Sequence, residues 1–119
     1  MAKYMILIYG DAQRWGAMSQ QEENELHEAH RAFRATAGSR VLGGDELAPA
    51  PTATSLRTDG ATGKLVTTDG PFLETKEALG GYYLVEAGDL DEVIALAGRL
   101  YEVSAGHSGV EIRPLVDHG

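Results

Sequence analysis

The order of the expected strands and helices along this 119-residue chain predicts an α+β fold. Three observations support it: two segments with helical periodicity, β-rich runs on both sides of each segment, and a hairpin signal between the two halves. A strand-helix-strand unit, a hairpin insertion and a second strand-helix-strand unit suit a ferredoxin-like (split βαβ) antiparallel sheet with two helices on one face.

The first unit begins with residues 4–9, a continuous apolar run that predicts a strand with two hydrophobic faces. Residues 12–18 should form a loop. Ser19 and Glu22 have the spacing of a capping box, which predicts the start of a helix that extends to about Ala37. The apolar stripe of this helix and its predicted C-terminal cap are Leu26, Ala29, His30, Phe33, Ala37 and Gly38.

The middle of the chain is rich in β-formers and turn residues. Residues 41–47 predict a strand with a bulge at Gly43–Gly44. A hairpin should follow, with strands at residues 52–58 and 64–68 joined by the turn Asp59–Gly63. The second strand-helix-strand unit then comes from the C-terminal part of the chain.

That second unit begins with a predicted strand at residues 82–86. Asp89 should cap a helix that extends to about Leu100, with Glu92 at its third position. Residues 110–115 predict the last strand. The buried stripe of the helix is expected to be Leu90, Val93, Ile94, Ala97 and Leu100.

The segment after the hairpin has the most distinctive local pattern. Asp69–Gly70 is a turn former, and Pro71 must end the preceding strand because it has no N–H donor for the ladder. Residues 74–79 could form one or two helical turns, which Gly80–Gly81 would end. Polar side chains on a stiff turn at a strand end are a common place for a site.

This segment resembles the DGPF branch of the YCII-related family. The resemblance covers nearly the whole chain, so residues 1–119 are expected to form a single domain; Leu73 stands where alanine is usual in that branch. It implies a ferredoxin-like domain of the dimeric α/β-barrel type and says little about the reaction. The matching segments are Asp69-Gly70-Pro71-Phe72, Glu74-Thr75-Lys76-Glu77, Gly80-Gly81-Tyr82-Tyr83, Lys3–Tyr9 and Val110–Leu115.

Composition limits the classes of function. The formal net charge of −8 argues against nucleic acid and against an anionic membrane surface as partners. The sequence has no cysteine, which excludes disulfides and a thiol nucleophile and fits a cytoplasmic protein. The apolar run at residues 4–9 is too short for a signal-peptide core or a membrane span.

The apolar character of the strands predicts an assembly. Residues 4–9 and 82–85 are hydrophobic toward both faces of the sheet, but two helices can cover only one face. We therefore expect a homodimer in which the open sheet faces pack against each other, with a pocket between them.

Three residues are candidates for acid–base catalysis. Asp69 at a strand end could act as a base or orient a histidine, although capping the turn is a simpler use. His30 lies on the apolar helix stripe, where a core histidine with a hydrogen-bond partner is the alternative. Its context is similar to that of the helix histidine in other YCII-related proteins, for which a His–Asp pair has been suggested as catalytic. His107 precedes the last strand and could reach the mouth of a pocket or simply be solvated.

No metal site is expected. His27 and His30 lie three residues apart, which is not the HExxH zinc spacing, and two ligands on one exposed turn bind metal weakly. No cofactor motif of the phosphate-cradle or nucleophile-elbow kind is present either, so we expect no cofactor.

Five further residues are candidates for binding a ligand. Arg113 could clamp a carboxylate, although an ion pair with Glu111 is the simpler interpretation. Lys76 could tune Asp69 or pair with its acidic neighbours. The aromatic candidates could stack on a flat ligand or pack in the core or an interface; they are Tyr9, Trp15 and Phe72.

Two functional hypotheses follow. The first is a cofactor-independent lyase or isomerase that moves a proton on a small carbonyl or phenolic compound. The second is a non-enzymatic protein that binds a small ligand or has an accessory regulatory role, as in family members found beside sigma factors. A purely structural dimer is a third possibility, and the sequence alone does not decide whether the protein is an enzyme.

Overall fold

The computed structural model describes residues 1–119. Its larger sheet has four antiparallel strands in the order β2-β5-β1-β6, and β3 pairs with β4 in a separate hairpin. This order is consistent with the predicted ferredoxin-like α+β fold, with the hairpin inserted between β2 and β5. The elements are β1 Ala2–Asp11, α1 Ala12–Gly16, α2 Gln20–Ala37, η1 Gly38–Arg40, β2 Val41–Glu46, η2 Ala50–Thr52, β3 Thr54–Thr58, β4 Leu65–Asp69, β5 Glu77–Ala87, α3 Leu90–Ala97, α4 Tyr101–Ser104 and β6 Ser108–Pro114.

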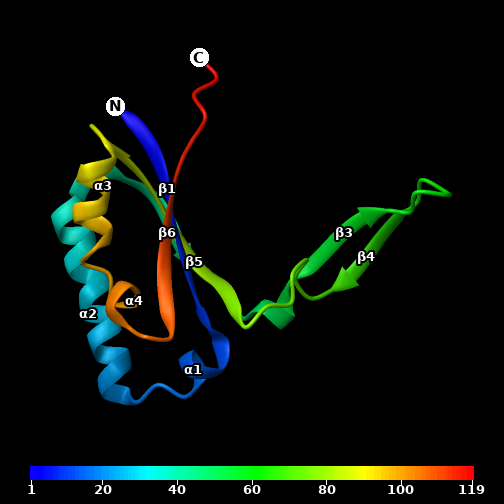
Figure 1. Ribbon diagram of the computed structural model, residues 1–119, viewed down its shortest axis with the longest axis horizontal. Helices are drawn as coiled ribbons and strands as arrows, with labels where there is room; N and C mark the ends of the chain where they lie inside the picture. Colours follow the sequence, from blue (N-terminus) through cyan, green and yellow to red (C-terminus); the bar gives the residue numbers. More distant parts are fainter.

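The core lies between the four-stranded sheet and a layer of helices on one of its faces (Figure 1). Alternate side chains of β1 and β5 point into this layer and are buried. The side chains between them point to the other face and are only half-buried, because no element of the chain covers that face. The core residues are Tyr4, Ile6, Ile8, Phe33, Ala37, Tyr83, Val85, Ala87, Val93, Leu96, Ala97 and Leu100.

The predicted ends of α2 are confirmed. The Ser19 hydroxyl accepts a hydrogen bond from the Glu22 backbone N–H at 3.1 Å, and the Glu22 carboxylate reaches back to the Ser19 N–H. Gly38 ends the helix with a φ of 56°, a conformation that favours glycine. The capping residues therefore fix the length of the helix that carries His30.

The second long helical segment differs in part from its prediction. Asp89 caps α3 as expected, accepting a hydrogen bond from the Glu92 N–H. However, Leu90 and Ile94 are 46% and 50% exposed, so their assignment to the buried stripe is wrong. The buried side instead follows Val93, Leu96 and Ala97, because the helix presents this i, i+3, i+4 row to the sheet.

The predicted helical turns at residues 74–79 are also wrong. Strand β5 already begins at Glu77, where Glu77 pairs with Asp11, and it continues through Gly80–Gly81. An isolated six-residue helix is marginal in water, whereas the extended end of β1 offers a complete ladder partner. The expected loop at residues 12–18 contains the short helix α1. Strand β2 has a register shift between Val41 and Gly43, just before the predicted bulge position, and Gly43 and Gly44 themselves pair in regular register.

Two surfaces of the chain lack a covering layer. We call the uncovered side of the sheet the open face; its apolar residues are Met5, Leu7, Tyr9, Tyr82 and Leu84. We call residues 53–73, which contain β3, β4 and the turn after them, the arm. Figure 1 shows the arm projecting from the sheet on the side away from α2 and α3. None of the helices is both long enough and apolar enough to span a bilayer.

One side-chain cluster ties the two helical segments together and gives a test of the fold. The Glu92 carboxylate accepts a hydrogen bond from the Gly88 N–H at 2.9 Å and pairs with Arg40, which follows α2. The Gly88 N–H, and next the Arg40 guanidinium, lower the pKa of Glu92 below its ordinary value of 4.5.

We predict that Glu92→Gln lowers the free energy of unfolding at pH 7. A carboxylate with a lowered folded-state pKa stabilises the fold above its ordinary pKa, and this contribution is lost as the pH falls through the folded value. The difference between wild type and variant should therefore shrink as the pH falls from 7 to 3 in urea unfolding experiments. Glu74→Gln, which removes an exposed carboxylate that makes no hydrogen bond or ion pair, should show no such trend. A difference that is independent of pH would contradict the ion-pair explanation.

Candidate functional site

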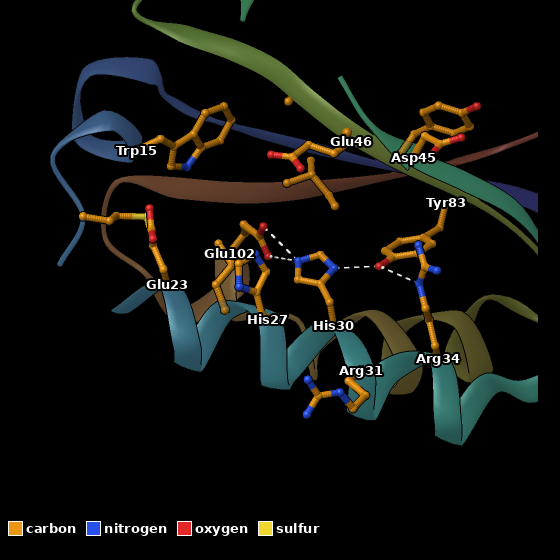
Figure 2. A pocket seen from close by; sticks show the side chains of 16 residues that line it. Trp15, Glu23, His27, His30, Arg31, Arg34, Asp45, Glu46, Tyr83 and Glu102 are labelled. Atoms are coloured by element: carbon orange, nitrogen blue, oxygen red, sulfur yellow. Dashed lines mark hydrogen bonds and ion pairs between the residues drawn. The ribbon is translucent and has the colours of Figure 1, made fainter. Parts of the chain in front are cut away.

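A pocket of about 530 Å³ lies on the covered side of the sheet, between α2 and the strands β2 and β5. Figure 2 shows side chains from α2 pointing up into it, with Trp15 at one end and Arg34 at the other. The sequence predicts a pocket between two packed sheets, whereas this pocket belongs to a single chain and lies on the opposite side of the sheet. Its volume suits a small organic molecule.

His30 is the centre of a hydrogen-bond network in the pocket wall. Its Nδ1 atom lies 2.6 Å from the Tyr83 hydroxyl. Its Nε2 atom lies 2.9 and 3.0 Å from the two carboxylate oxygens of Glu102. The dashed lines in Figure 2 follow this chain from Glu102 through His30 to Tyr83 and Arg34. The histidine is thus held at both ring nitrogens by its own chain.

The protons of this network can be assigned from donor and acceptor chemistry. A carboxylate can only accept, so the His30 Nε2 carries the hydrogen that Glu102 receives. In a neutral imidazole the Nδ1 then accepts, so the Tyr83 hydroxyl donates to it. Arg34 Nε lies 3.5 Å from the Tyr83 oxygen and donates to it. The hydrogen bonds thus run in one direction: Arg34 donates to Tyr83, Tyr83 donates to His30, and His30 donates to Glu102.

Local sequence patterns explain how the three central groups meet. His30 lies on the same stripe of α2 as Phe33, one turn along the helix. Tyr83 and Val85 lie two residues apart on β5, so both point to the covered side of the sheet. The Tyr83 ring packs on the Phe33 ring, with centroids 4.5 Å apart. Glu102, on the short helix α4, is only 5% exposed and is the one buried charged residue. A buried carboxylate needs a partner, and His30 provides it.

Arg34 places a positive charge beside the Tyr83 hydroxyl. Its guanidinium carbon lies 5.3 Å from the centre of the Tyr83 ring. The hydrogen bond to Tyr83, and next the charge interaction with Tyr83, raise the pKa of Arg34, so it remains a cation at every physiological pH. This cation would stabilise negative charge on the Tyr83 oxygen.

Trp15 closes one end of the pocket, and two glycines make its position possible. A Cβ atom on Gly80 would lie 2.5 Å from the indole ring, and one on Gly10 would lie 2.4 Å from it. The indole N–H donates to the Ser108 hydroxyl at 2.9 Å. Gly80, in the segment that resembles the DGPF branch, therefore leaves room for Trp15 rather than ending a helix.

Of the sequence-predicted site residues, His30 and Trp15 line the pocket. Asp69 is exposed at the end of β4, where it pairs with Thr54. Phe72 is 57% exposed on the arm, beneath the Arg57 guanidinium. Both lie outside the pocket of a single chain, so their proposed roles stay predictions.

Three further predicted ligand residues lie on the uncovered side or the rim of the sheet. Tyr9 belongs to the open face. Arg113 donates a hydrogen bond to Glu111, two residues away on β6, as the simpler interpretation expects. Lys76 is 83% exposed and lies 3.9 Å from Asp11, not beside its acidic sequence neighbours. The structure gives none of them a place in the pocket.

His107 is half-buried beside α4 and is not part of the pocket wall. Its Nδ1 lies 2.7 Å from the Ser108 hydroxyl, which also accepts the Trp15 indole N–H. Its Nε2 is buried without a hydrogen-bond partner. The residue thus supports the anchoring of Trp15 and does not contact His30. The structure has no cluster of three or more side chains arranged to hold a metal ion.

Three members of the network were missed at the level of sequence: Glu102, Tyr83 and Arg34. Alternation along residues 82–86 places Tyr83 on the same face as Val85, so its position could have been found. The helical period puts Arg34 on the solvent-exposed side of α2, in agreement with its exposure in the structure, so the period gives no sign of its contact with Tyr83. Glu102 follows a break in the helix at Gly98–Leu100, so no continuous stripe points to it.

Comparison with known proteins gives two matches. The family model of the YCII-related domain matches residues 2–117. An uncharacterized protein of Rhizobium meliloti (strain 1021) is 33% identical over 114 residues, which cover 94% of this chain and 90% of that protein. The family match extends over every strand and helix and over the residues that line the pocket.

The position of the Trp15 ring can be tested by fluorescence, because Trp15 is the only tryptophan in the chain. We predict that Gly80→Ala displaces the indole, shifts its fluorescence emission to the red and lowers stability by about 1–3 kcal/mol through overpacking. Gly16→Ala, in α1 itself, is the control, since a Cβ there meets no atom within 4 Å. Unchanged emission in Gly80→Ala would mean that Trp15 does not occupy this position.

Proposed function

The chain belongs to the YCII-related family, and on that premise we propose that it is a small acid–base enzyme. It would move a proton on a compact carbonyl or phenolic compound, as a lyase or isomerase does, without a cofactor. The observation that carries this proposal is the chain of groups Glu102–His30–Tyr83, held at hydrogen-bond distance in the wall of a pocket.

The proposed chemistry follows from the free positions in this network. Both nitrogens of His30 are occupied, so the Tyr83 oxygen is the atom that can meet a substrate, since a hydroxyl has two lone pairs and one hydrogen. The Tyr83 proton passes to His30 Nδ1, and the phenolate oxygen accepts a proton from the substrate. Glu102 stabilises the imidazolium and Arg34 stabilises the phenolate. The Tyr83 hydroxyl then donates this proton to another substrate atom, and His30 Nδ1 returns its own proton to the Tyr83 oxygen, which completes an isomerisation and restores the starting network.

The pocket lining combines apolar side chains with ionisable ones such as Glu23, Asp45 and Glu46, which supports a small substrate that has both an apolar part and polar groups. Ile8, Met18 and Leu26 form apolar parts of the wall, and the Trp15 ring closes one end. Arg34 lies where an oxyanion adjacent to the transferred proton would be stabilised. A compact enolisable carbonyl compound or a phenol fits this combination.

We predict that the wild-type protein catalyses proton exchange in a panel of small carbonyl and phenolic compounds. In deuterated buffer, deuterium incorporation at carbon, followed by NMR, reports the proton transfer directly. Tyr83→Phe should lower the exchange rate by roughly 10²–10⁴-fold, the range for a lost general acid–base group. His30→Gln and Glu102→Gln should also lower it, because each breaks the relay.

Tyr4→Phe is the matched control, since Tyr4 is a buried tyrosine of β1 outside the pocket. Its exchange rate should equal that of the wild type. If a panel compound binds the wild-type pocket tightly but no variant changes its exchange, the acid–base proposal is wrong. The protein would then be a ligand-binding or accessory protein, the alternative that the sequence leaves open.

We also propose that the protein is a homodimer that forms through the open faces and works in the cytoplasm. The open face carries five large apolar side chains that are only half-buried in the single chain. A contiguous uncovered patch of this kind marks a protein interface, and the same patch on two copies can be self-complementary about a twofold axis. The cysteine-free composition suits a reducing compartment.

Leu7, in the middle of β1, tests this dimer. We predict that Leu7→Asp raises the dimer Kd at least 100-fold, because a charge would be buried in an apolar contact. Light scattering coupled to size exclusion at micromolar concentration should show a dimer for wild type and a monomer for the variant. Ile94→Asp, an equivalent change on the outer side of α3, should remain dimeric. A monomeric wild type would overturn the proposal.

A further inference from the structure

The arm is not held by any core of its own chain. Strands β3 and β4 pair with each other, and none of their ten residues is buried. An isolated two-stranded hairpin is marginally stable in water unless it packs on something. Five large apolar side chains on the arm are nevertheless 42–76% exposed; they are Leu56, Leu65, Val66, Phe72 and Leu73.

The size of the chain indicates how much surface lacks a partner. The accessible surface is 8035 Å², whereas a folded monomer of 12.7 kDa is expected to expose about 6,200 Å². The radius of gyration is 16.6 Å, against about 13.5 Å expected for a compact chain of this length. The excess of about 1,800 Å² is comparable to what one partner of an obligate dimer buries.

The two broad sides of the hairpin differ. Cross-strand register places Leu56 opposite Thr67 and Leu65 opposite Thr58, so both leucines share one side with Asp69. We call this side the leucine side; its residues are Thr54, Leu56, Thr58, Leu65, Thr67 and Asp69. The other side is partly occupied by its own chain, because Ser55 donates a hydrogen bond to the Gly70 carbonyl and Arg57 stacks on Phe72. The leucine side is therefore the free one.

The segment that resembles the DGPF branch fixes the base of the arm. Gly70 is buried with a φ of 101°, a conformation that only glycine adopts readily, and its N–H donates to the Ala53 carbonyl at 2.7 Å. Together with the Ser55–Gly70 hydrogen bond, this closes the two strands at the end nearest the sheet. The turn thus fixes the pairing of β3 with β4 at the base of the arm.

We infer that the arm of each copy packs its leucine side on a second copy of this chain, across the partner's open face. This inference rests on the homodimer proposed above and deepens it. The arm projects on the side of the sheet away from the helices (Figure 1), which is the side where a partner packed on the open face must lie. A twofold axis gives both copies the same contact, so two arms cover two open faces. Asp69 then faces the partner instead of bulk water.

The test compares neighbouring residues on opposite sides of strand β4. We expect Leu65→Asp, on the leucine side, to raise the dimer Kd at least tenfold in sedimentation experiments. Val66→Asp, the next residue but on the other side, should change it less than threefold. Both positions are exposed in the single chain, so neither substitution disturbs a core.

Hydrogen exchange gives a second measurement. In the wild-type dimer the backbone amides of β3 and β4 should exchange at least tenfold more slowly than in the monomeric variant Leu7→Asp. If wild type is dimeric but Leu65→Asp has no effect and the arm amides exchange at the same rate in both proteins, this inference is wrong and the open-face dimer stands. If the wild-type protein is a monomer, the open-face dimer and the arm contact are both wrong. The proton-exchange measurements on Tyr83 are separate and test neither the arm contact nor the dimer.

Discussion

The constraint on which the rest of the structure depends is that two long helical segments can cover only one face of a four-stranded sheet. On the covered face, alternate residues of β1 and β5 form the core with α2 and α3. Polar groups on that side lose contact with water, so they must satisfy each other. On the open face the chain provides no covering layer, and the apolar residues there remain half-buried. The pocket network and the proposed assembly are consequences of this asymmetry.

Burying the Glu102 carboxylate on the covered face costs free energy unless it is paired, so its presence there needs an explanation. Leaving a buried polar group without its hydrogen-bond partner typically costs about 1–3 kcal/mol, and more for a charged group, whereas replacing both partners by apolar groups of the same shape is often nearly neutral. A core built for stability alone would not need Glu102 beneath His30. The charge is retained together with a tyrosine hydroxyl and an arginine at the edge of a pocket. The acid–base proposal rests on this combination, because packing alone does not require it.

The sequence predicts what depends on local pattern and misses what depends on long-range contact. Ser19 and Glu22 signal the start of α2, and the 3.6-residue period places His30 on its inner stripe, as the structure confirms. Gly80–Gly81 looks locally like a helix stop, but pairing with β1 and the space needed by Trp15 make it strand. Glu102 lies after a break in helical phase, so periodicity cannot place it. Its contact with His30 spans 72 residues and exists only in the folded chain.

Strand β5 joins the two sides of the sheet, because its successive side chains alternate between them. Tyr83 points to His30 on the covered side, while Tyr82 and Leu84 point to the open face on either side of it. A second copy packed on Tyr82 and Leu84 would restrict the backbone that positions the Tyr83 hydroxyl. Catalytic groups must be held within a fraction of an ångström, and a strand covered on both faces is more rigid than one covered on a single face. The proposed dimer therefore supports the proposed chemistry without contributing a residue to the pocket.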